Sequence, residues 1–401
     1  MSKPLTAEVA VVGGGPAGLT AAIALASAGI ETALVAPRSG ADHRTTALLA
    51  GSVTALETLG VWDGCAEHAA PLRVMRIVDA TARLVRAPEV SFSAAEIGLD
   101  SFGHNIENRH LIAALEARTA RLTSLVRYLD EARVVEPHEG NTTIGLKGDD
   151  SLAVQLVIGA DGRRSLCRDA AGIESDSRAY SQTALTFNLA HSRPHDDTST
   201  EFHTEGGPFT LVPLPGRRSS LVCVVKPVEA EKLAALDDAA LNDEIERRSH
   251  SILGKVGVEP GRGVFQLAVE TARRFAHNRI ALVGEAAHLI PPIGAQGLNL
   301  GLRDAASIGE LVVAARRDGR DVGAADLLAR YDALRRADVN SRTLAVDLLN
   351  RTLLSDFLPV QGARGLSLYL IDRIGPLRRA AMREGVAPAA AQPRLMRGEA
   401  L

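Results

Sequence analysis

A glycine-rich stretch between residues 279 and 304, RIALVGEAAHLIPPIGAQGLNLGLRD, holds the groups best suited to chemistry. Residues 280–283 form a short apolar run that suits a buried strand. Pro291 and Pro292 favour an extended loop, because the residue before a proline avoids the helical conformation. Leucine and alanine recur at helical spacing from Leu298 on, so the loop opens onto a helix N-terminus. Free N–H groups and the helix dipole favour an electron-rich partner there, although a connection without a ligand fits the same pattern.

A second glycine motif lies near the start of the sequence. Gly13, Gly15 and Gly18 form a G-x-G-x-x-G pattern between an apolar run at 9–12 and an alanine-rich helical stretch at 19–28. In this context the first glycine permits a tight turn, and the second lets a pyrophosphate approach the backbone. The third lets helix and strand pack closely. The pattern therefore predicts a dinucleotide-binding βαβ unit.

Composition narrows the class of protein. A chain of 401 residues can bury a large core and is expected to form two domains, and its net charge of −3 argues against nucleic-acid binding. Cys65, Cys167 and Cys223 are too scattered for a metal cluster or a disulfide framework, which suits a reducing cytoplasm. Glycines divide the uncharged stretch 9–30 into strand, loop and helix, so we expect a soluble protein.

The two motifs together resemble those of the ubiquinone-biosynthesis hydroxylases, aromatic-ring flavoprotein monooxygenases with the para-hydroxybenzoate hydroxylase fold. Their signature reads His-Pro-Ile-Ala-Gly-Gln-Gly-x-Asn-x-Gly-x-x-Asp. The matching positions are Pro292, Ile293, Gln296, Gly297, Asn299, Gly301 and Asp304. The departures are Pro291 for the His, an inverted Gly294-Ala295 pair, and Glu285 for the Asp of Gly-Asp-Ala-Ala-His. These departures bear on the substrate more than on the cofactor.

The resemblance implies that FAD is bound non-covalently by a defined set of residues. This set is Gly13, Gly15, Gly18, Arg44, Arg109, Asp161, Gly162, Gly284, Glu285, Pro292, Gly297, Leu298 and Asn299. Arg44 would lie over the pyrophosphate, which a planar guanidinium binds through two hydrogen bonds. Arg109 would approach the cofactor, although an ordinary helix N-terminus explains it almost as well. The loop that contains Pro292, Gly294, Gln296 and Gly297 would lie next to the flavin.

Two positions leave alternatives open. Asp161 belongs to a pattern A-D-G-x-x-S-x-x-R that borders the flavin in the family, but capping of a helix at 163–171 explains it equally well. The second strand of the βαβ unit should end in an acidic residue for the ribose, and Ala36 stands there. Arg38 would then indicate a 2′-phosphate and NADP, but the flavin-like motifs favour a ribose held by Ser39 or by the backbone.

The chemistry that the resemblance implies resides on the flavin. NADH or NADPH reduces FAD, O2 adds as a flavin hydroperoxide, and an oxygen atom passes to the ring of a prenylated phenol. The protein would position the ring, exclude water and stabilise the anionic reduced flavin from the helix N-terminus. The sequence shows no competing catalytic set. His191, His195 and His203 lie in a polar stretch without metal-ligand geometry, so no metal is expected.

Other functions remain possible on the same fold. They are an isoprenoid reductase, a hydroxylase of another small phenol, a halogenase, and a prenyl-binding carrier that has lost the flavin. Halogenases carry a Trp-x-Trp-x-Ile-Pro motif, whereas Trp62 is the only tryptophan here. The intact glycine motifs argue against a carrier.

The expected fold class is α/β, with a Rossmann-like FAD-binding domain interleaved with a mainly antiparallel β-sheet substrate domain and followed by C-terminal helices. The FAD-binding domain comprises residues 1–71, 100–180 and 271–345. The substrate domain comprises 72–99 and 181–270, and a helical segment with a tail comprises 346–401. Among the elements, we expect one strand at 152–158, one helix at 230–250 and a flexible tail at 388–401.

The C-terminal segment carries an apolar stripe at helical spacing. Its members are Leu366, Leu370, Ile371, Ile374 and Leu377, with Arg373, Arg378, Arg379 and Arg383 among or after them. Short amphipathic helices usually pack on their own protein or on a second subunit. The alternative is peripheral docking at the inner face of the membrane or in a biosynthetic complex, which would guide a prenyl tail to the site.

Overall fold

The computed structural model describes residues 5–38, 40, 42–83, 86–292, 294–354, 358–386 and 392–401. Its helices are α1 (Pro16–Ser27), α2 (Ala50–Thr58), α3 (Asn108–Thr119), α4 (Leu166–Ala170), α5 (Pro227–Ala235), α6 (Asp238–Arg248), α7 (Gln296–Arg317), α8 (Ala325–Leu354), α9 (Leu358–Arg373) and α10 (Gly375–Val386). Its 3-10 helices are η1 (Trp62–Gly64), η2 (Ala66–His68), η3 (Ala94–Ile97), η4 (Gly284–Ala286) and η5 (Arg394–Arg397). Its strands are β1 (Leu5–Thr6), β2 (Val9–Val12), β3 (Thr32–Val35), β4 (Thr45–Leu49), β5 (Ala69–Pro71), β6 (Val74–Asp79), β7 (Val90–Ser93), β8 (Gly103–Glu107), β9 (Leu125–Tyr128), β10 (Ala132–Pro137), β11 (Thr142–Leu146), β12 (Ser151–Val154), β13 (Leu156–Gly159), β14 (Ser175–His191), β15 (Thr198–His203), β16 (Pro208–Leu214), β17 (Arg218–Val225), β18 (Val256–Val258), β19 (Gly263–Ala272), β20 (Ala276–His277), β21 (Ile280–Leu282) and β22 (His288–Leu289).

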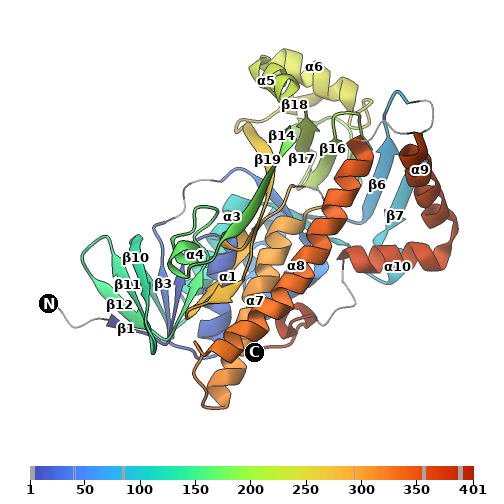
Figure 1. Ribbon diagram of the computed structural model, residues 1–401. Helices are drawn as coiled ribbons and strands as arrows, with labels where there is room; N and C mark the ends of the chain where they lie inside the picture. Colours follow the sequence, from blue (N-terminus) through green and yellow to red (C-terminus); the bar gives the residue numbers. More distant parts are fainter. Residues whose placement is uncertain are drawn as a thin grey trace.

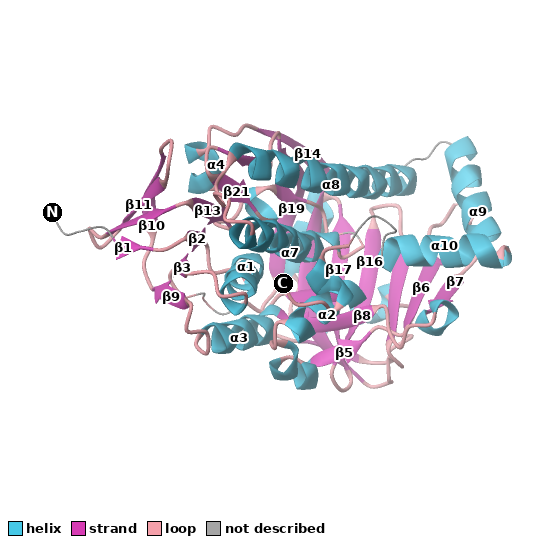
Figure 2. Cartoon of the chain, turned by 90° about the horizontal axis from the view of Figure 1, so that it is seen from below, coloured by secondary structure: helices cyan, strands magenta, loops and turns pink. Residues whose placement is uncertain are grey.

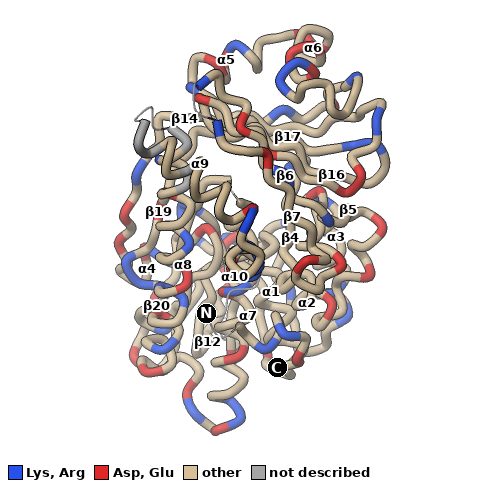
Figure 3. Tube along the Cα trace, turned by 90° about the vertical axis from the view of Figure 1, so that its right-hand side faces the viewer, with Lys and Arg blue, Asp and Glu red and all other residues tan. Residues whose placement is uncertain are grey.

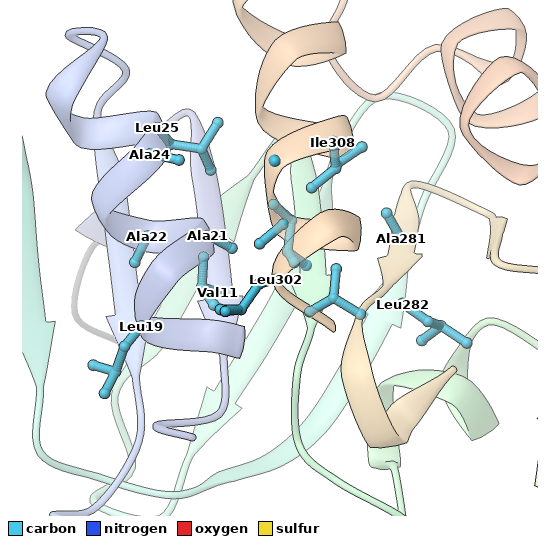
Figure 4. Close-up of a cluster of buried hydrophobic side chains, with 14 of the residues drawn as sticks. Val11, Leu19, Ala21, Ala22, Ala24, Leu25, Ala281, Leu282, Leu302 and Ile308 are labelled. Atoms are coloured by element: carbon cyan, nitrogen blue, oxygen red, sulfur yellow. The ribbon is translucent and has the colours of Figure 1, made fainter. Parts of the chain in front are cut away.

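A six-stranded sheet with the order β20-β21-β13-β2-β3-β9 forms the first unit. Its strands run parallel except β20. The sequences VAVV in β2 and LVIG in β13 are continuously apolar and buried, as parallel strands covered on both faces must be. Helices α1 and α7 contact each other beside this sheet (Figure 2), and Figure 4 shows Leu25 and Leu302 in the shared core.

A nine-stranded, mainly antiparallel sheet forms the second unit. Its main path is β22-β19-β14-β17-β16-β15-β6-β7, and β18 pairs with β14. Alternate side chains, among them Leu185, Leu221 and Cys223, pack into a second core with α5 and α6. Figure 1 shows α5 and α6 at the end of the molecule remote from α1 and α7. The other face of the sheet therefore looks toward the first unit.

Successive segments of the chain belong alternately to the six-stranded sheet and to the nine-stranded sheet. The six-stranded sheet takes strands from residues 9–35, 125–128, 156–159 and 276–282. The nine-stranded sheet takes its strands from two of the intervening stretches, beginning with β6, and its last strand, β22, follows β21. Two smaller sheets, β1-β12-β11-β10 and β4-β8-β5, complete the described strands.

Two sequence-based expectations about single elements are wrong. The strand expected at 152–158 is interrupted at Gln155, and its halves β12 and β13 belong to different sheets. The helix expected at 230–250 is interrupted at Leu236, which is extended. Asp237 then caps α6 by accepting a hydrogen bond from a backbone N–H of its first turn.

The expectation of a flexible tail at 388–401 is also wrong for the part that the structure describes, 392–401. There η5 packs against α2 and α7, and the side chains of Leu395 and Met396 are 1% and 5% exposed. The Arg394 N–H donates a hydrogen bond to Glu310 of α7 (2.9 Å). Burial of these apolar side chains holds the segment in place.

Candidate functional site

Three glycines shape the turn between β2 and α1, and their surroundings differ. Gly13 has a φ of 121°, and a Cβ there would lie 2.1 Å from the Ala160 carbonyl oxygen. A Cβ at Gly18 would lie 2.2 Å from the Gly13 carbonyl oxygen. A Cβ at Gly15 would meet nothing within 4 Å. Packing therefore requires Gly13 and Gly18, whereas Gly15 borders open space at the N-terminus of α1, which has no side-chain cap.

Helix α7 holds the second glycine loop against this turn. Gly284 in η4 has a φ of 60°. A Cβ at Gly301 would lie 3.2 Å from the Gly284 Cα and 3.3 Å from the Ala17 Cβ, so only a glycine allows α7 to approach this closely. Glu285 follows Gly284 and is exposed. The two glycine motifs, which are far apart in the sequence, therefore meet at the N-termini of α1 and α7.

A buried ionic network fixes the second loop. The fully buried Asp304 carboxylate accepts hydrogen bonds from the Gly284 N–H (3.0 Å), from Nε2 of His288 (2.7 Å) and from Nε of Arg335 (2.7 Å). Burial alone would raise the pKa of Asp304, but its interactions with His288 and Arg335 lower it to about 2. Arg335 also donates a hydrogen bond from Nη1 to Oδ2 of Asp338 (2.7 Å). Asp304 thus connects α7, α8 and the loop that carries Glu285.

Arg44 and Arg109 lie near the paired ends of β4 and β8. Arg44 donates hydrogen bonds to both carboxylate oxygens of Asp42 (2.9 and 2.8 Å) and remains 57% exposed. The hydrogen bond to Asp42 raises the pKa of Arg44, and the negative charge of Glu285 adds to the effect. Arg109 donates to Glu107 at 2.9 Å.

The side chain of Asn299 forms all of its hydrogen bonds with other groups of the protein. Its Oδ1 accepts hydrogen bonds from the Leu49 N–H (2.8 Å) and the Ser52 hydroxyl (2.7 Å), and its Nδ2 donates to the carbonyls of Ala47 (2.8 Å) and Ala295 (2.6 Å). Four bonds fill the capacity of an amide. The side chain therefore ties β4 and α2 to α7, and only the backbone of Asn299 is left for the cofactor contact that the sequence predicts.

The loop before α7 ends in an uncapped helix N-terminus. Ala295 takes a left-handed conformation with a φ of 54°, and no side chain caps α7. Pro292 and Gly294 are exposed, and Gln296, Gly297 and Leu298 are half-buried. Ile293 lies outside the described residues. A Cβ at Gly297 would meet nothing within 4 Å, so the first turn of α7, like that of α1, borders open space.

Asp161 has an observed structural role. Its carboxylate accepts hydrogen bonds from the Ser165 hydroxyl (2.6 Å) and the Cys167 N–H (3.0 Å). Helix α4 begins at Leu166, with Ser165 as its N-cap, and not at residue 163 as expected. Gly162 has a φ of 80°. Ser39, a candidate for the ribose, lies outside the described residues.

The three histidines of the polar stretch bond to the protein around them. His191 contacts the Ser219 hydroxyl, His195 contacts the Leu214 carbonyl, and His203 contacts Glu201. Within the described residues, no three metal-ligating side chains form a group that could hold an ion. A cavity of about 290 Å³ lies beside His195, and its lining includes no residue of the two glycine loops.

The fold and the two glycine loops define a flavoprotein of the FAD-binding class, and comparison with known proteins agrees. The family model described as FAD binding domain matches residues 6–344. The chain therefore belongs to this family and is an FAD-dependent monooxygenase. Within the described residues, no helix combines the length and apolarity needed to cross a bilayer.

Particular relatives refine this assignment. The chain is 36% identical to ubiquinone hydroxylase UbiL of Rhodospirillum rubrum, over 99% of this chain and 94% of that protein. It is 33% identical to 3-demethoxyubiquinol 3-hydroxylase of Escherichia coli, over 94% of this chain and 97% of that protein.

Solved structures show the same fold at lower identity. The p-nitrophenol 4-monooxygenase PnpA of Pseudomonas putida matches with a TM-score of 0.78 at 20% identity, over 96% of this chain and 100% of that one. HpxO of Klebsiella pneumoniae, complexed with FAD and uric acid, matches with a TM-score of 0.74 at 21% identity, over 96% and 97%. The expected fold class is confirmed.

Proposed function

We propose that this protein hydroxylates the aromatic ring of a polyprenylated phenol in ubiquinone biosynthesis, using O2 and NADH or NADPH. The observation that carries the proposal is the likeness to a ubiquinone hydroxylase over nearly the whole chain. The Escherichia coli relative, a 3-demethoxyubiquinol 3-hydroxylase, supports a ring carbon as the point of attack.

The residues of the two glycine loops fit FAD. Open space at Gly15 leaves room for a pyrophosphate against the first N–H groups of α1, where the helix dipole favours negative charge. Arg44 would exchange the Asp42 carboxylate for phosphate oxygens, which its planar fork binds in the same way. Glu285 would accept hydrogen bonds from the ribityl hydroxyls. Arg109 and the Asp161-Gly162 turn would border the flavin ring.

The chain contributes positioning and electrostatics, whereas bound FAD supplies the redox chemistry with nicotinamide and O2. The uncapped N–H groups at Gly297 and Leu298 would stabilise negative charge on the flavin ring, because the N-terminus of α7 is partially positive. The loop from Pro292 to Gly297 would exclude water from the reacting ring. The network at Asp304 would hold this arrangement in register.

The C-terminal helices would meet the membrane that contains a prenylated substrate. Leu366, Leu370, Ile374 and Leu377 are 57%, 37%, 44% and 44% exposed, so the described chain leaves most of the stripe uncovered. Ile371 is half-buried. Figures 1 and 2 show α9 and α10 at one side of the molecule, next to β6 and β7, and Figure 3 views this side from the front. An apolar surface in this position would receive a prenyl tail and direct its ring inward.

One arginine of this segment, Arg378, forms contacts that hold α10 against the rest of the protein. Arg378 is 12% exposed, donates to Glu96 at 2.6 Å and lies over the Phe92 ring at 4.6 Å. It therefore attaches α10 to η3 and β7 and is not free for lipid, contrary to the grouping that the sequence suggests. Arg373 and Arg379 are exposed and would provide the contact to anionic lipid, worth about 1 kcal/mol each.

Product analysis tests the proposed function. The purified protein is loaded with FAD and incubated with NADH or NADPH, O2 and a phenol that carries a single isoprene unit. Mass spectrometry should find a product with one added oxygen atom, derived from labelled O2. An isoprenoid reductase would instead add hydrogen to the side chain, and a carrier would return the phenol unchanged, so either result contradicts hydroxylation.

A further inference from the structure

One face of the nine-stranded sheet contacts strand β8 of the small sheet β4-β8-β5. Asn188 of β14 donates a hydrogen bond from Nδ2 to Oε1 of Glu107 in β8 (3.0 Å). Asn105 of β8 donates to the Ser220 hydroxyl of β17 (3.1 Å). Residues that pair across strands share a face, so these contacts identify the inner face along the whole sheet.

A continuous row crosses this inner face and is left partly open. Its members, paired from strand to strand, are Thr186, Val222, Thr210, Glu201 and Ile77. All five are half-buried. The neighbouring residues that point to the other face, including Leu185, Leu211 and Phe202, are at most 2% exposed in the core with α5 and α6. The row is therefore the partly accessible part of the inner face.

Glu201 is the only ionisable residue in this row, and its carboxylate is held in a fixed position. Oε1 contacts Nε2 of His203 at 2.9 Å, and Oε2 accepts a hydrogen bond from the Thr210 hydroxyl at 3.3 Å. The Glu201 side chain is 22% exposed, whereas that of His203 is 3% exposed. Glu201 is thus the more accessible member of the pair, and His203 lies beside it on the same face of β15. A carboxylate only accepts hydrogen bonds, so Nε2 carries the proton and His203 donates.

Two other charged groups of the inner face, Asp79 and Arg218, are hydrogen-bonded to neighbouring protein groups. Asp79, which pairs with His203, accepts hydrogen bonds from the Thr81 N–H, the Thr81 hydroxyl and the Ala87 N–H. Arg218 is bound to Glu259 through two hydrogen bonds of 2.6 Å each. Glu201 is the carboxylate best placed to meet a molecule above the row.

We propose that Glu201 is the catalytic base that takes the hydroxyl proton of the phenolic substrate, with His203 as its positioning residue. The inference rests on the proposed function. In the step, the substrate O–H bond breaks, its proton forms an O–H bond with Glu201, and its electron pair stays on the phenolate oxygen. No electrons change hands. The negative charge spreads into the ring and makes its carbons more nucleophilic toward an electrophilic oxygen atom.

The proton also has a defined return path. After oxygen transfer, the attacked ring carbon loses its hydrogen as a proton to water, and the Glu201 carboxylic acid returns its proton to the phenolate oxygen. The carboxylate is thereby regenerated. The contacts with His203 and with the Thr210 hydroxyl orient the Glu201 carboxylate between turnovers.

The test compares Glu201→Gln with Glu231→Gln, an exposed position of α5 on the far side of the sheet. Both variants are loaded with FAD and mixed with the phenol that carries a single isoprene unit. We expect kcat of Glu201→Gln to fall by about 10²- to 10⁴-fold, the usual contribution of a general base, with KM and flavin content little changed. Glu231→Gln should behave as the parent protein.

A measurement without turnover separates a base from a structural residue. The ultraviolet difference spectrum of the phenol bound to the oxidised holoenzyme should show phenolate with the parent protein and neutral phenol with Glu201→Gln. A ring-fluorinated analogue, whose hydroxyl is more acidic, should restore much of the lost kcat. Thr210→Val, which keeps the carboxylate, should retain the phenolate spectrum.

The outcomes separate a failure of the proposed hydroxylation from a failure of the role assigned to Glu201. If the parent protein gives no oxygenated product, the proposed function fails. If it does, and Glu201→Gln keeps both its kcat and the phenolate spectrum, Glu201 is not the base. Should Glu201→Gln lose FAD or fail to fold, Glu201→Asp is measured instead. The proposal then requires a reduced kcat with phenolate still formed, and an unchanged kcat or a neutral bound phenol overturns it.

Discussion

Replacement of Asp304 by asparagine would test the buried network beneath the cofactor loop. Asp304→Asn keeps the volume of the side chain but removes the charge that balances Arg335, which is 1% exposed. Removal of one partner from a buried ion pair costs about 3–5 kcal/mol. A protein domain has a free energy of unfolding of about 5–15 kcal/mol. We therefore expect a loss of a fifth or more of the free energy of unfolding, measured by urea titration followed by circular dichroism on the FAD-free protein.

The pH dependence gives the same network a second signature. The pKa of Asp304 is lowered from 3.8 to about 2 in the folded protein, so the carboxylate favours folding when it is charged. That contribution is present above pH 3.8 and is lost as the pH falls through about 2. The shift corresponds to roughly 2 kcal/mol. Asp304→Asn should remove this part of the acid destabilisation.

A matched control is available on the surface. Asp318 is 61% exposed and pairs with Arg320 at 3.0 Å, so Asp318→Asn should change the free energy of unfolding by less than about 1 kcal/mol. The Gly284 N–H loses its charged acceptor only in Asp304→Asn, and FAD affinity should fall only there. A loss below about 1 kcal/mol in Asp304→Asn, with the acid slope unchanged, would refute the reasoning.

Three further outcomes follow from the site and the C-terminal helices. Gly15→Val should fold normally but bind no FAD, because its side chain enters open space that the pyrophosphate needs, whereas Gly18→Val should disturb the fold itself. Circular dichroism measures the fold and flavin absorbance measures bound FAD. A Gly15→Val protein with full flavin absorbance contradicts pyrophosphate binding at this turn. Glu285→Ala should weaken FAD binding by about 1.5–3 kcal/mol, and an unchanged dissociation constant in a fluorescence titration removes its role. Arg373→Glu combined with Arg379→Glu should reduce binding to vesicles that contain phosphatidylserine while FAD content stays constant; equal sedimentation of parent and variant assigns the stripe to a protein partner or a second copy.

The glycine motifs could be predicted because each has a local physical cause. Gly13 and Gly18 sit where a Cβ would collide with backbone oxygens, and Gly15 sits where it would fill open space. The sequence also indicates the α/β class, since the buried parallel strands appear as continuous apolar runs. For the contacts of Arg44 and Glu285 with FAD, the structure supplies positions, and the contacts themselves stay predictions.

The rest depends on distant partners that spacing does not reveal. Asp304 stands in the matched signature, but nothing in the sequence connects it to Arg335, which lies on another helix. Asn299 shows the same limit, because three of its four bonds reach back to residues near position 50. Glu201 lies in an ordinary strand, and only the pairing of five strands reveals that it belongs to the inner face of the sheet. The expectation for the described tail residues was wrong because their burial depends on contacts with α2 and α7, which are distant in the sequence.

The alternation of the chain between two sheets has a consequence for folding. The central strands β2 and β13 are translated early, but β21, which completes the core beside β13, and α7, which covers α1, come more than a hundred residues after β13. Neither sheet can close from one contiguous segment, so most stabilising contacts join distant parts of the chain. Such topologies fold slowly and expose apolar strands in the meantime. A nascent chain of this protein would therefore depend on chaperones until α7 has left the ribosome, and FAD would bind only after that point.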